Sequence, residues 1–254
     1  MLIDTHAHLD FEEYKDDFNS VLKKIHEADV KKVIIPGVEP CGFDNIINFL
    51  EIDGIFGALG VHPSCIETWD DNVGEQIKNL AKHPKIVAIG EIGLDYHYDK
   101  ENSDIQKEIF IKQIELAKEL HLPIIVHDRD AHGDTLDILK QTNAKEVGVV
   151  LHCFSGSVEF AQECIKEGFL ISLGGVITFK NAKKPQEVAT QIGLEHIMLE
   201  TDSPYLTPEP YRGKTNTPAY IPFVAQKIAE LKNISVEEVS NITTQNAIRF
   251  FGLS

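Results

Sequence analysis

Short runs of apolar, mostly β-branched residues recur along the chain, with longer stretches of mixed polarity between them. The runs are Leu2–Asp4, Lys32–Gly37, Ile55–Val61, Ile86–Gly90, Pro123–His127, Gly148–His152, Phe169–Gly174 and His196–Asp202. Within each run the apolar positions are nearly continuous, which is typical of parallel strands that are covered on both faces. The pattern therefore predicts a parallel sheet with one strand for each run.

Stretches with helical periodicity separate these runs. Apolar faces combine Phe18, Val21, Leu22 and Ile25 in one stretch, and Ile109, Ile114, Ala117 and Leu120 in another. Further helices are predicted around residues 42–51, 73–82, 132–140, 157–167 and 184–192. A chain of eight strands, each followed by a helix, has the arrangement of an α/β TIM (β/α)₈ barrel.

The chain continues after the last strand. An irregular segment, Ser203–Pro218, precedes helices predicted near 219–231 and 236–250, the second of which begins with a capping box of Ser235 and Glu238. We therefore expect a single TIM-barrel domain over residues 1–254 with a C-terminal helical extension. Because the irregular segment is rich in charged and aromatic residues, we expect it to carry function.

Composition narrows the classes of function. The length of 254 residues suits one barrel, and 43% hydrophobic and 25% charged residues are ordinary for a globular protein with a full core. The net charge of −16 argues against a general attraction to nucleic acid or anionic membranes. A substrate that carries phosphate would have to be held by local cations or by metal ions.

The cysteines and the N-terminus bear on the compartment. Cys41, Cys65, Cys153 and Cys164 form no C-x-x-C pair, and a chain of this size needs no disulfides. The N-terminus lacks the pattern of a signal peptide, and no apolar run reaches the length of a membrane span. We expect a cytoplasmic protein. No long exposed apolar face is evident, which favours a monomer without an obligate protein partner.

Ligand-type residues gather where the apolar runs end. His6 and His8 are two residues apart, so in an extended strand both imidazoles project from one face, as half of a metal site. At corresponding ends of later strands stand Glu91, His127, His152 and Asp202. In a TIM barrel these ends form the active-site face. Four imidazoles and two carboxylates suit two divalent cations, with Glu91 placed to bridge them.

The type of ligand favours borderline metals. Zn²⁺, Mn²⁺ and Co²⁺ accept such a mixture of nitrogen and oxygen, whereas Mg²⁺ prefers more oxygen. Taken singly, each residue also has a simpler interpretation: Glu91 as a salt-bridge partner, His127 and His152 as core histidines, and Asp202 as a turn cap. Glu200 shares the face of Asp202 and either binds a metal itself or orients a residue that does. His62, at another strand end, either contacts substrate or caps a loop.

Several separated motifs together resemble the signatures of the TatD family of metal-dependent deoxyribonucleases, within the amidohydrolase superfamily. The motifs are Asp4–His8, Gly90–Tyr96, His152–Gly156 and Glu200–Leu206, in family order over residues 2 to about 250. The resemblance implies a TIM barrel with a two-metal centre, occupied by Mg, Mn or Zn. The implied ligands are His6, His8, Glu91 and Asp202 for the first metal, and Glu91, His127 and His152 for the second.

A further segment, Pro210–Pro218, resembles the Arg-Gly-Lys-x-Asn segment of the family. Two positions depart from it: Tyr211 stands where many members have His, and Thr217 stands where Glu is common. Neither position is among the implied ligands.

The resemblance implies hydrolysis of phosphodiester bonds in DNA, of the 3′–5′ exonuclease-like kind. Glu91 and Asp202 are then the catalytic carboxylates, and Asp202 orients the nucleophile or shuttles its proton. Arg129, Arg212 and Lys214 are candidates to bind flanking phosphates, although Arg129 equally suits a surface salt bridge.

Two other functions remain open. One is a metal-dependent hydrolase of another ester or an amide on the same scaffold, although relatives of that kind often have Lys between the metals, where this chain offers Glu91. The other is a non-catalytic binding protein that a metal stabilises.

Overall fold

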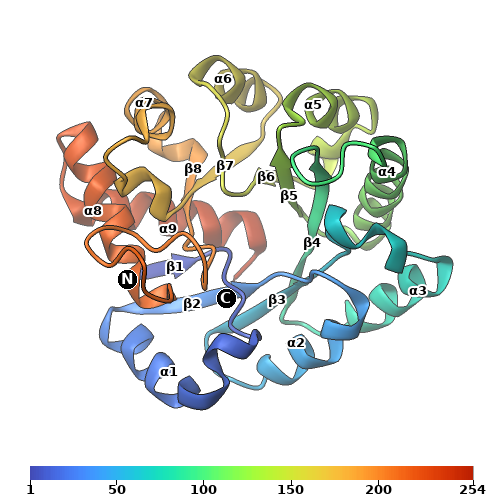
Figure 1. Ribbon diagram of the computed structural model, residues 1–254, viewed down its shortest axis with the longest axis horizontal. Coiled ribbons are helices and arrows are strands. Elements are labelled where there is room, and N and C mark those ends of the chain that lie inside the picture. Colours follow the sequence, from blue (N-terminus) through green and yellow to red (C-terminus); the bar gives the residue numbers. More distant parts are fainter. Residues whose placement is uncertain (254) are drawn as a thin grey trace. The chain divides into compact units, whose positions relative to one another are not determined.

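The computed structural model, drawn in Figure 1, describes residues 1–253. The contacts of the chain divide it into two compact units. Unit 1 comprises Met1–Ile35, Cys153–Gln162 and Ile171–Ser254, and unit 2 comprises Pro36–His152 and Glu163–Leu170. The expected single domain over residues 1–254 stays a prediction.

The predicted strands are all present. They are β1 (Leu2–Asp4), β2 (Val30–Ile35), β3 (Ile55–Leu59), β4 (Ile86–Asp95), β5 (Ile124–Arg129), β6 (Val149–Leu151), β7 (Leu170–Leu173) and β8 (Ile197–Leu199). They form an eight-stranded sheet in the order β1 to β8, and its registered pairs are parallel. This is the strand order of a TIM (β/α)₈ barrel, so the predicted fold class is confirmed.

Each predicted helix is also present. They are α1 (Phe18–Glu27), α2 (Phe43–Phe49), α3 (Asp71–Leu80), α4 (Ser103–Leu120), α5 (His132–Gln141), α6 (Val158–Lys166), α7 (Lys183–Gln191), α8 (Ile221–Lys232) and α9 (Val236–Phe251). Shorter 3₁₀ helices are η1 (Glu12–Asp17), η2 (Pro40–Gly42), η3 (Pro63–Thr68), η4 (Ala144–Glu146), η5 (Gly175–Thr178), η6 (Leu194–His196) and η7 (Pro218–Tyr220). None of the helices in residues 1–253 combines the length and apolar character needed to cross a membrane.

The C-terminal extension belongs to unit 1. The Glu238 N–H donates to Ser235 Oγ over 3.1 Å, which caps α9 at its first turn, as the sequence predicts. Helix α9 ends at Phe251, and the next residue, Gly252, has a φ of 63°, in the left-handed region that glycine adopts freely. Within unit 1, α9 packs against β1, β8 and α8.

Strand β4 is longer than predicted. It continues past Gly90 to Asp95, and its pairing with β5 extends over Gly93↔His127 and Asp95↔Arg129. A side chain at Gly93 would place its Cβ 2.0 Å from the His127 carbonyl oxygen, so close pairing requires glycine there. Glu91 consequently lies inside a buried strand and not at its end.

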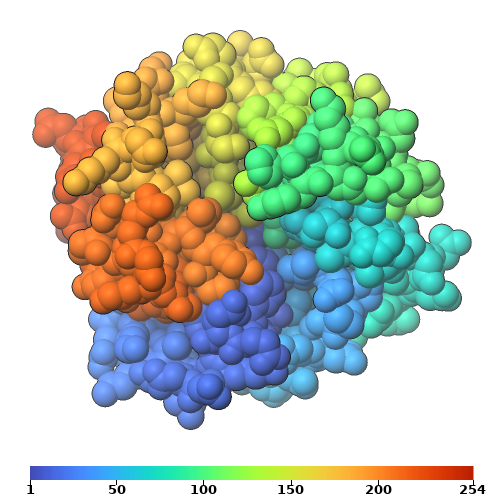
Figure 2. Space-filling view, viewed as in Figure 1, coloured from blue at the N-terminus to red at the C-terminus, as the bar shows by residue number. Residues whose placement is uncertain are grey.

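The irregular segment after β8 lies against the N-terminal segment of the same unit. Figure 2 shows this segment in orange beside the dark blue residues near the N-terminus. The Tyr14 hydroxyl donates to the Asn216 carbonyl oxygen over 2.7 Å, and the Phe11 and Tyr205 rings meet edge to face at 6.4 Å. The loop of residues 203–218 is thus tied to the chain that follows β1.

Candidate metal centre

In unit 2, one buried carboxylate gathers several imidazoles. Glu91 Oε1 lies 2.6 Å from His127 Nδ1, 2.7 Å from His152 Nε2 and 3.5 Å from His62 Nε2. The two nearer nitrogens are 3.3 Å apart. Glu91 is only 4% exposed. The sequence-predicted residues of this unit, Glu91, His127 and His152, are therefore brought together, with His62 beside them.

The sheet register explains why these residues meet. Val126 pairs with Leu151 across β5 and β6, so His127 and His152 follow at the same level of adjacent strands. The His152 N–H also donates to the Val126 carbonyl oxygen over 3.0 Å. Parallel strands end at one edge of the sheet, so the residue after each run reaches the same region.

A residue that the sequence analysis did not select, Asp95, completes this cluster. Its Oδ2 lies 3.2 Å from His127 Nε2, while its Oδ1 accepts the N–H groups of His97 and Tyr98. A carboxylate on the far nitrogen of a ligating histidine fixes the ring and leaves the near nitrogen for the metal. A signal was present, because Asp95 is four residues after Glu91 and so on the same face of an extended strand.

The titration of these groups follows from their contacts. Burial lowers the pKa of the His127 imidazole, but hydrogen bonds to Asp95 and Glu91 outweigh burial and leave this pKa raised. Burial raises the pKa of Asp95, yet its hydrogen bonds to His127 and to backbone N–H groups leave it lowered. For His62, burial dominates over the attraction of Glu91, and its pKa is lowered.

His62 has a defined tautomer when neutral. The backbone N–H of Ser64 donates to His62 Nδ1 over 3.0 Å, so that nitrogen carries a lone pair and the proton resides on Nε2. Nε2 is the atom that faces Glu91. The sequence left open whether His62 caps a loop or contacts substrate; the structure shows that it caps η3 while its Nε2–H faces the cluster.

In unit 1, His6, His8 and Asp202 form a second, looser group. The Nε2 atoms of His6 and His8 each lie 3.8 Å from Asp202 Oδ1. Strand β1 ends at Asp4, so both histidines follow the strand, and Ala7 between them pairs with Ser203.

Backbone bonds hold this group together. The Asp202 N–H donates to the His6 carbonyl oxygen over 2.9 Å, and the His8 N–H donates to the Ser203 carbonyl oxygen over 2.8 Å. Asp202 itself has a φ of 53°, an uncommon left-handed conformation for a residue with a side chain.

Two buried carboxyl groups accept hydrogen bonds from residues close to this group. Asp4, which is fully buried, accepts the backbone N–H of Thr201 over 2.9 Å and its hydroxyl over 2.5 Å. Burial raises the pKa of Asp4 to about 8. Glu200 Oε1 accepts the Cys153 N–H over 2.5 Å, and a role of Glu200 in orienting a metal ligand stays a prediction. The sequence analysis did not select Asp4 or Thr201, although a carboxylate inside an apolar run was a signal for them.

The predicted phosphate-binding residues are all exposed and stacked on aromatic rings. The Arg129 guanidinium lies 4.8 Å from the Tyr98 ring centre in unit 2, and Arg212 lies 3.8 Å from the Phe179 ring centre in unit 1. Lys214 Nζ lies 5.1 Å from the Tyr211 ring centre. Within residues 1–253 none of these three cations forms a salt bridge, so each keeps its charge available.

The donor set of unit 2 fits a divalent cation. Ligand atoms of His62, Glu91 and His127 lie within 4.8 Å of one another, and His152 Nε2 lies equally close to the carboxylate. Since the Nε2 of neutral His62 carries a proton, the donors with free lone pairs are the carboxylate and the other two imidazoles. Nitrogen and oxygen donors in this ratio suit Zn²⁺, Mn²⁺ or Co²⁺.

Comparison with known proteins agrees with these features. A family model described as "TatD related DNase" matches residues 3–252. An uncharacterized metal-dependent hydrolase of Bacillus subtilis, YabD, is 47% identical, with all of both chains covered. The corresponding hydrolase of Escherichia coli, YcfH, is 40% identical and covers 98% of this chain and 95% of its own. The crystal structure of the E. coli TatD homolog YjjV superposes with a TM-score of 0.94 at 32% identity, covering 100% and 98%.

Together with the barrel, these matches define the chain as a metal-dependent hydrolase. More closely, the chain belongs to the TatD family, as the match over almost its whole length shows. The resemblance that the sequence motifs carry is thereby confirmed. The family relationship leaves the number and identity of the metals, and the substrate, to be proposed.

Proposed function

We propose that this protein is a deoxyribonuclease that hydrolyses phosphodiester bonds of DNA, in the manner of a 3′–5′ exonuclease. The observation that carries the proposal is the convergence of His127 and His152 on the buried carboxylate of Glu91. The description of the matching family model, a DNase, supports the choice of substrate.

We assign two divalent cations, Mg, Mn or Zn, to the site. His6, His8, Glu91 and Asp202 would hold the first, and Glu91, His127 and His152 would hold the second. Bound cations of this kind lower the pKa of water and neutralise the charge of a phosphoryl group. The chain supplies the remaining functions.

Each remaining polar residue has a role that its contacts support. Asp202 orients the attacking water and accepts its proton. The Nε2–H of His62 donates to a phosphoryl oxygen, because its tautomer is fixed by Ser64. The cations Arg129, Arg212 and Lys214 hold flanking phosphates. Glu200 orients a metal ligand.

A hydrolase of another ester or an amide is the second candidate. The structure of an organophosphorus hydrolase from Deinococcus radiodurans is similar at 13% identity, which concerns the fold alone. Glu91 stands where relatives with such chemistry often have Lys, and a carboxylate there favours the nuclease.

The test is an assay of the purified, metal-loaded protein on single- and double-stranded DNA beside a panel of small esters and amides. We expect release of nucleotides from DNA, and no release by the His6→Ala/His8→Ala double variant. If wild type and double variant release nucleotides equally, or if only an ester or amide is cleaved, the nuclease assignment is wrong.

We also infer that the protein acts as a cytoplasmic monomer, without an obligate protein partner. The four cysteines form no C-x-x-C pair, and a chain of 254 residues needs no disulfides, which suits a reducing compartment. Light scattering coupled to size exclusion should give the mass of one chain, and a mass of two chains would contradict the monomer.

A further inference from the structure

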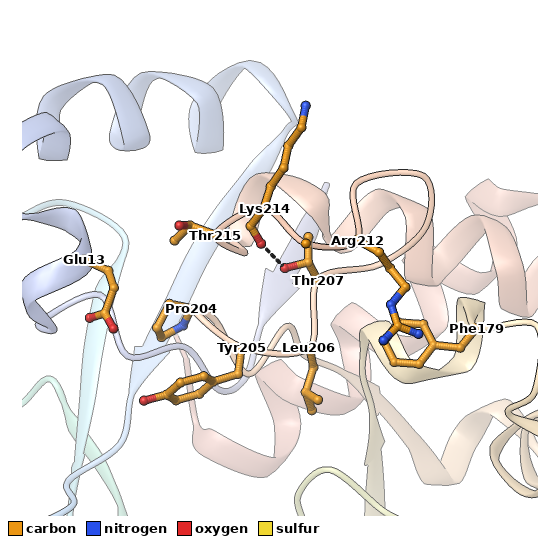
Figure 3. Close-up of a pocket in the computed structure, with 10 residues that line it drawn as sticks. Glu13, Phe179, Pro204, Tyr205, Leu206, Thr207, Arg212, Lys214 and Thr215 are labelled. Atoms are coloured by element: carbon orange, nitrogen blue, oxygen red, sulfur yellow. Dashed lines mark hydrogen bonds between the residues drawn. The ribbon is translucent and has the colours of Figure 1, made fainter.

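A cavity of about 450 Å³ opens in unit 1 beside the loop of residues 203–218. Figure 3 shows Glu13, Tyr205, Lys214, Arg212 and Phe179 around it. The volume lies within the range of small-molecule sites, about 300–1,000 Å³.

The cavity adjoins the histidine group of the same unit. The Tyr205 N–H donates to the Asp202 carbonyl oxygen over 3.0 Å. The Phe11 ring stacks on the His8 ring at 4.6 Å and meets the Tyr205 ring at 6.4 Å. A row of three rings thus leads from a candidate metal ligand to the cavity wall.

The charges of the cavity are polarised. Figure 3 shows Arg212 against Phe179 on one side and Glu13 on the opposite side, while the Lys214 side chain extends away from both. Neither cation forms a salt bridge with any residue that the structure describes, in a chain with 40 acidic and 24 basic residues. The ring of Phe179 holds the Arg212 guanidinium at 3.8 Å without neutralising it. The cation side therefore attracts an anion, and the Glu13 side repels it.

Tyr205 supplies an apolar platform in the cavity. Its side chain is 53% exposed, unusual for a large ring, while the loop that carries it is fixed. The Asn216 side-chain amide donates to the Tyr205 carbonyl oxygen over 2.6 Å, and the Thr207 hydroxyl donates to the Lys214 carbonyl oxygen over 2.5 Å. An exposed ring on a preorganised loop binds a flat ligand at little entropic cost.

We propose that this cavity binds one nucleotide, with the phosphate against Arg212 and the base stacked on Tyr205. This inference rests on the proposed function, because it seats a nucleotide next to the scissile phosphate. Stacking on a tyrosine needs a base that is free of its neighbours, so the ligand is a free nucleotide or a nucleotide of a single strand. Both share the chemistry of a phosphate joined to an exposed base.

The test uses thymidine 5′-monophosphate, which has no phosphodiester and is not consumed. Its binding to the metal-loaded protein is measured by calorimetry, beside thymidine and inorganic phosphate. We expect Tyr205→Leu and Arg212→Ala each to weaken binding of the monophosphate about tenfold. Tyr205→Leu should weaken thymidine binding and leave phosphate unchanged, whereas Arg212→Ala should do the reverse.

Three variants serve as controls. Tyr205→Phe keeps the ring and should retain the affinity. Lys184→Ala removes one exposed charge of α7 that does not line the cavity, and it should leave binding unchanged. Thermal unfolding of Tyr205→Leu and Arg212→Ala establishes that both are folded, and Arg212→Lys provides a milder change if the alanine variant is not.

Hydrolysis of single-stranded oligothymidylate distinguishes a free nucleotide from a nucleotide of the strand as the ligand of the cavity. If the cavity seats a nucleotide of the strand, both variants raise KM and leave kcat unchanged. If they affect only the monophosphate, the cavity serves free nucleotides.

Unchanged affinity for the monophosphate in both Tyr205→Leu and Arg212→Ala would overturn the assignment of the cavity, even in an active nuclease. Wild-type protein that binds the monophosphate through these residues but cleaves no DNA would instead overturn the proposed function.

Discussion

The two histidine groups differ in how tightly they are built. In unit 2, Glu91 lies within 2.7 Å of two imidazole nitrogens. The register of β5 and β6 places the two histidines at one level, and Glu91 lies in β4 beside them. In unit 1, the imidazoles of His6 and His8 lie 3.8 Å from Asp202, on segments that follow the strands and are joined by backbone bonds. The first group is a hydrogen-bonded network inside a sheet, and the second is assembled from the segments that follow β1 and β8.

The two groups therefore suit different tasks. A site whose residues stand on strands is held more rigidly than a site on loops. We therefore expect the unit 2 group to bind its metal firmly. The unit 1 group adjoins the cavity at Tyr205 and the loop of residues 203–218. We therefore expect changes in unit 2 to appear first as loss of metal, and changes at Asp202 to appear first as loss of turnover.

The largest expected effect is that of Glu91→Gln. Without the negative charge, the two imidazoles have no anion between them, and we expect metal content to fall together with a loss of kcat of about a thousandfold or more. Asp202→Asn should lower kcat by at least about a hundredfold and retain most of the metal. Elemental analysis and DNA hydrolysis are measured on the same preparations. If Asp202→Asn loses as much metal as Glu91→Gln, the two histidine groups do not differ in how they retain metal.

Asp95→Asn comes next. It keeps the shape but weakens the hydrogen bond that orients His127, so metal affinity or activity should fall about 10- to 100-fold. Asp130→Asn in the same unit is the matched control, since Asp130 is exposed and paired with His97 at 3.2 Å. Metal affinity is measured by competition with a chelating dye. Equal affinities for Asp95→Asn and wild type would mean that the strand register alone orients His127.

These two predictions differ in how far the sequence could supply them. Glu91, His127 and His152 were accessible because each follows or interrupts an apolar run, and parallel strands bring such positions together. Asp95 was not selected, because a carboxylate after Leu94 also suits a strand that has ended. Only the pairing of β4 with β5 shows that the strand continues and that its partner is a histidine 32 residues away.

The fold itself was more accessible than the site. The bounds of β1 are those predicted, and every other strand overlaps its predicted run. In unit 1 the sequence marked Asp4 as a carboxylate inside an apolar run but could not supply its partner, Thr201, which lies 197 residues later. A sequence pattern predicts which face of a strand a residue occupies. It does not predict which distant residue will donate a hydrogen bond to that side chain.

A smaller effect is expected at His62. His62→Ala removes the Nε2–H that faces Glu91, and we expect kcat/KM to fall about tenfold or more while metal content stays unchanged. His62→Gln, which restores an N–H donor, should recover part of the loss. The ring nitrogens of His62 should show the Nε2–H tautomer by ¹⁵N NMR. Loss of metal in His62→Ala, or an Nδ1–H signal, would make His62 a ligand and enlarge the unit 2 group.

The smallest effect is expected at the surfaces of the two units. Unlike the histidine groups, these surfaces resemble each other, because each carries an exposed aspartate paired with a cation. In unit 1, Asp29 lies 2.7 Å from the Met1 amine and 2.9 Å from Lys31 Nζ, and these hydrogen bonds lower its pKa to about 2. In unit 2, Asp134 lies 2.7 Å from Lys107 Nζ, which lowers the pKa of its carboxyl.

Since both folded-state pKa values lie below the ordinary value of 3.8, each ionised carboxylate stabilises the fold above about pH 4, and this stability is lost as the pH falls toward the folded value. Asp29→Asn and Asp134→Asn should each lower stability at pH 7 by at most about 1 kcal/mol, because both side chains are largely exposed. The Tm difference from wild type should shrink below pH 4 for both. If one variant destabilised the protein far more than the other, unequal effects of the site variants would reflect unequal stability of the units, and the contrast between the two histidine groups would need no functional explanation.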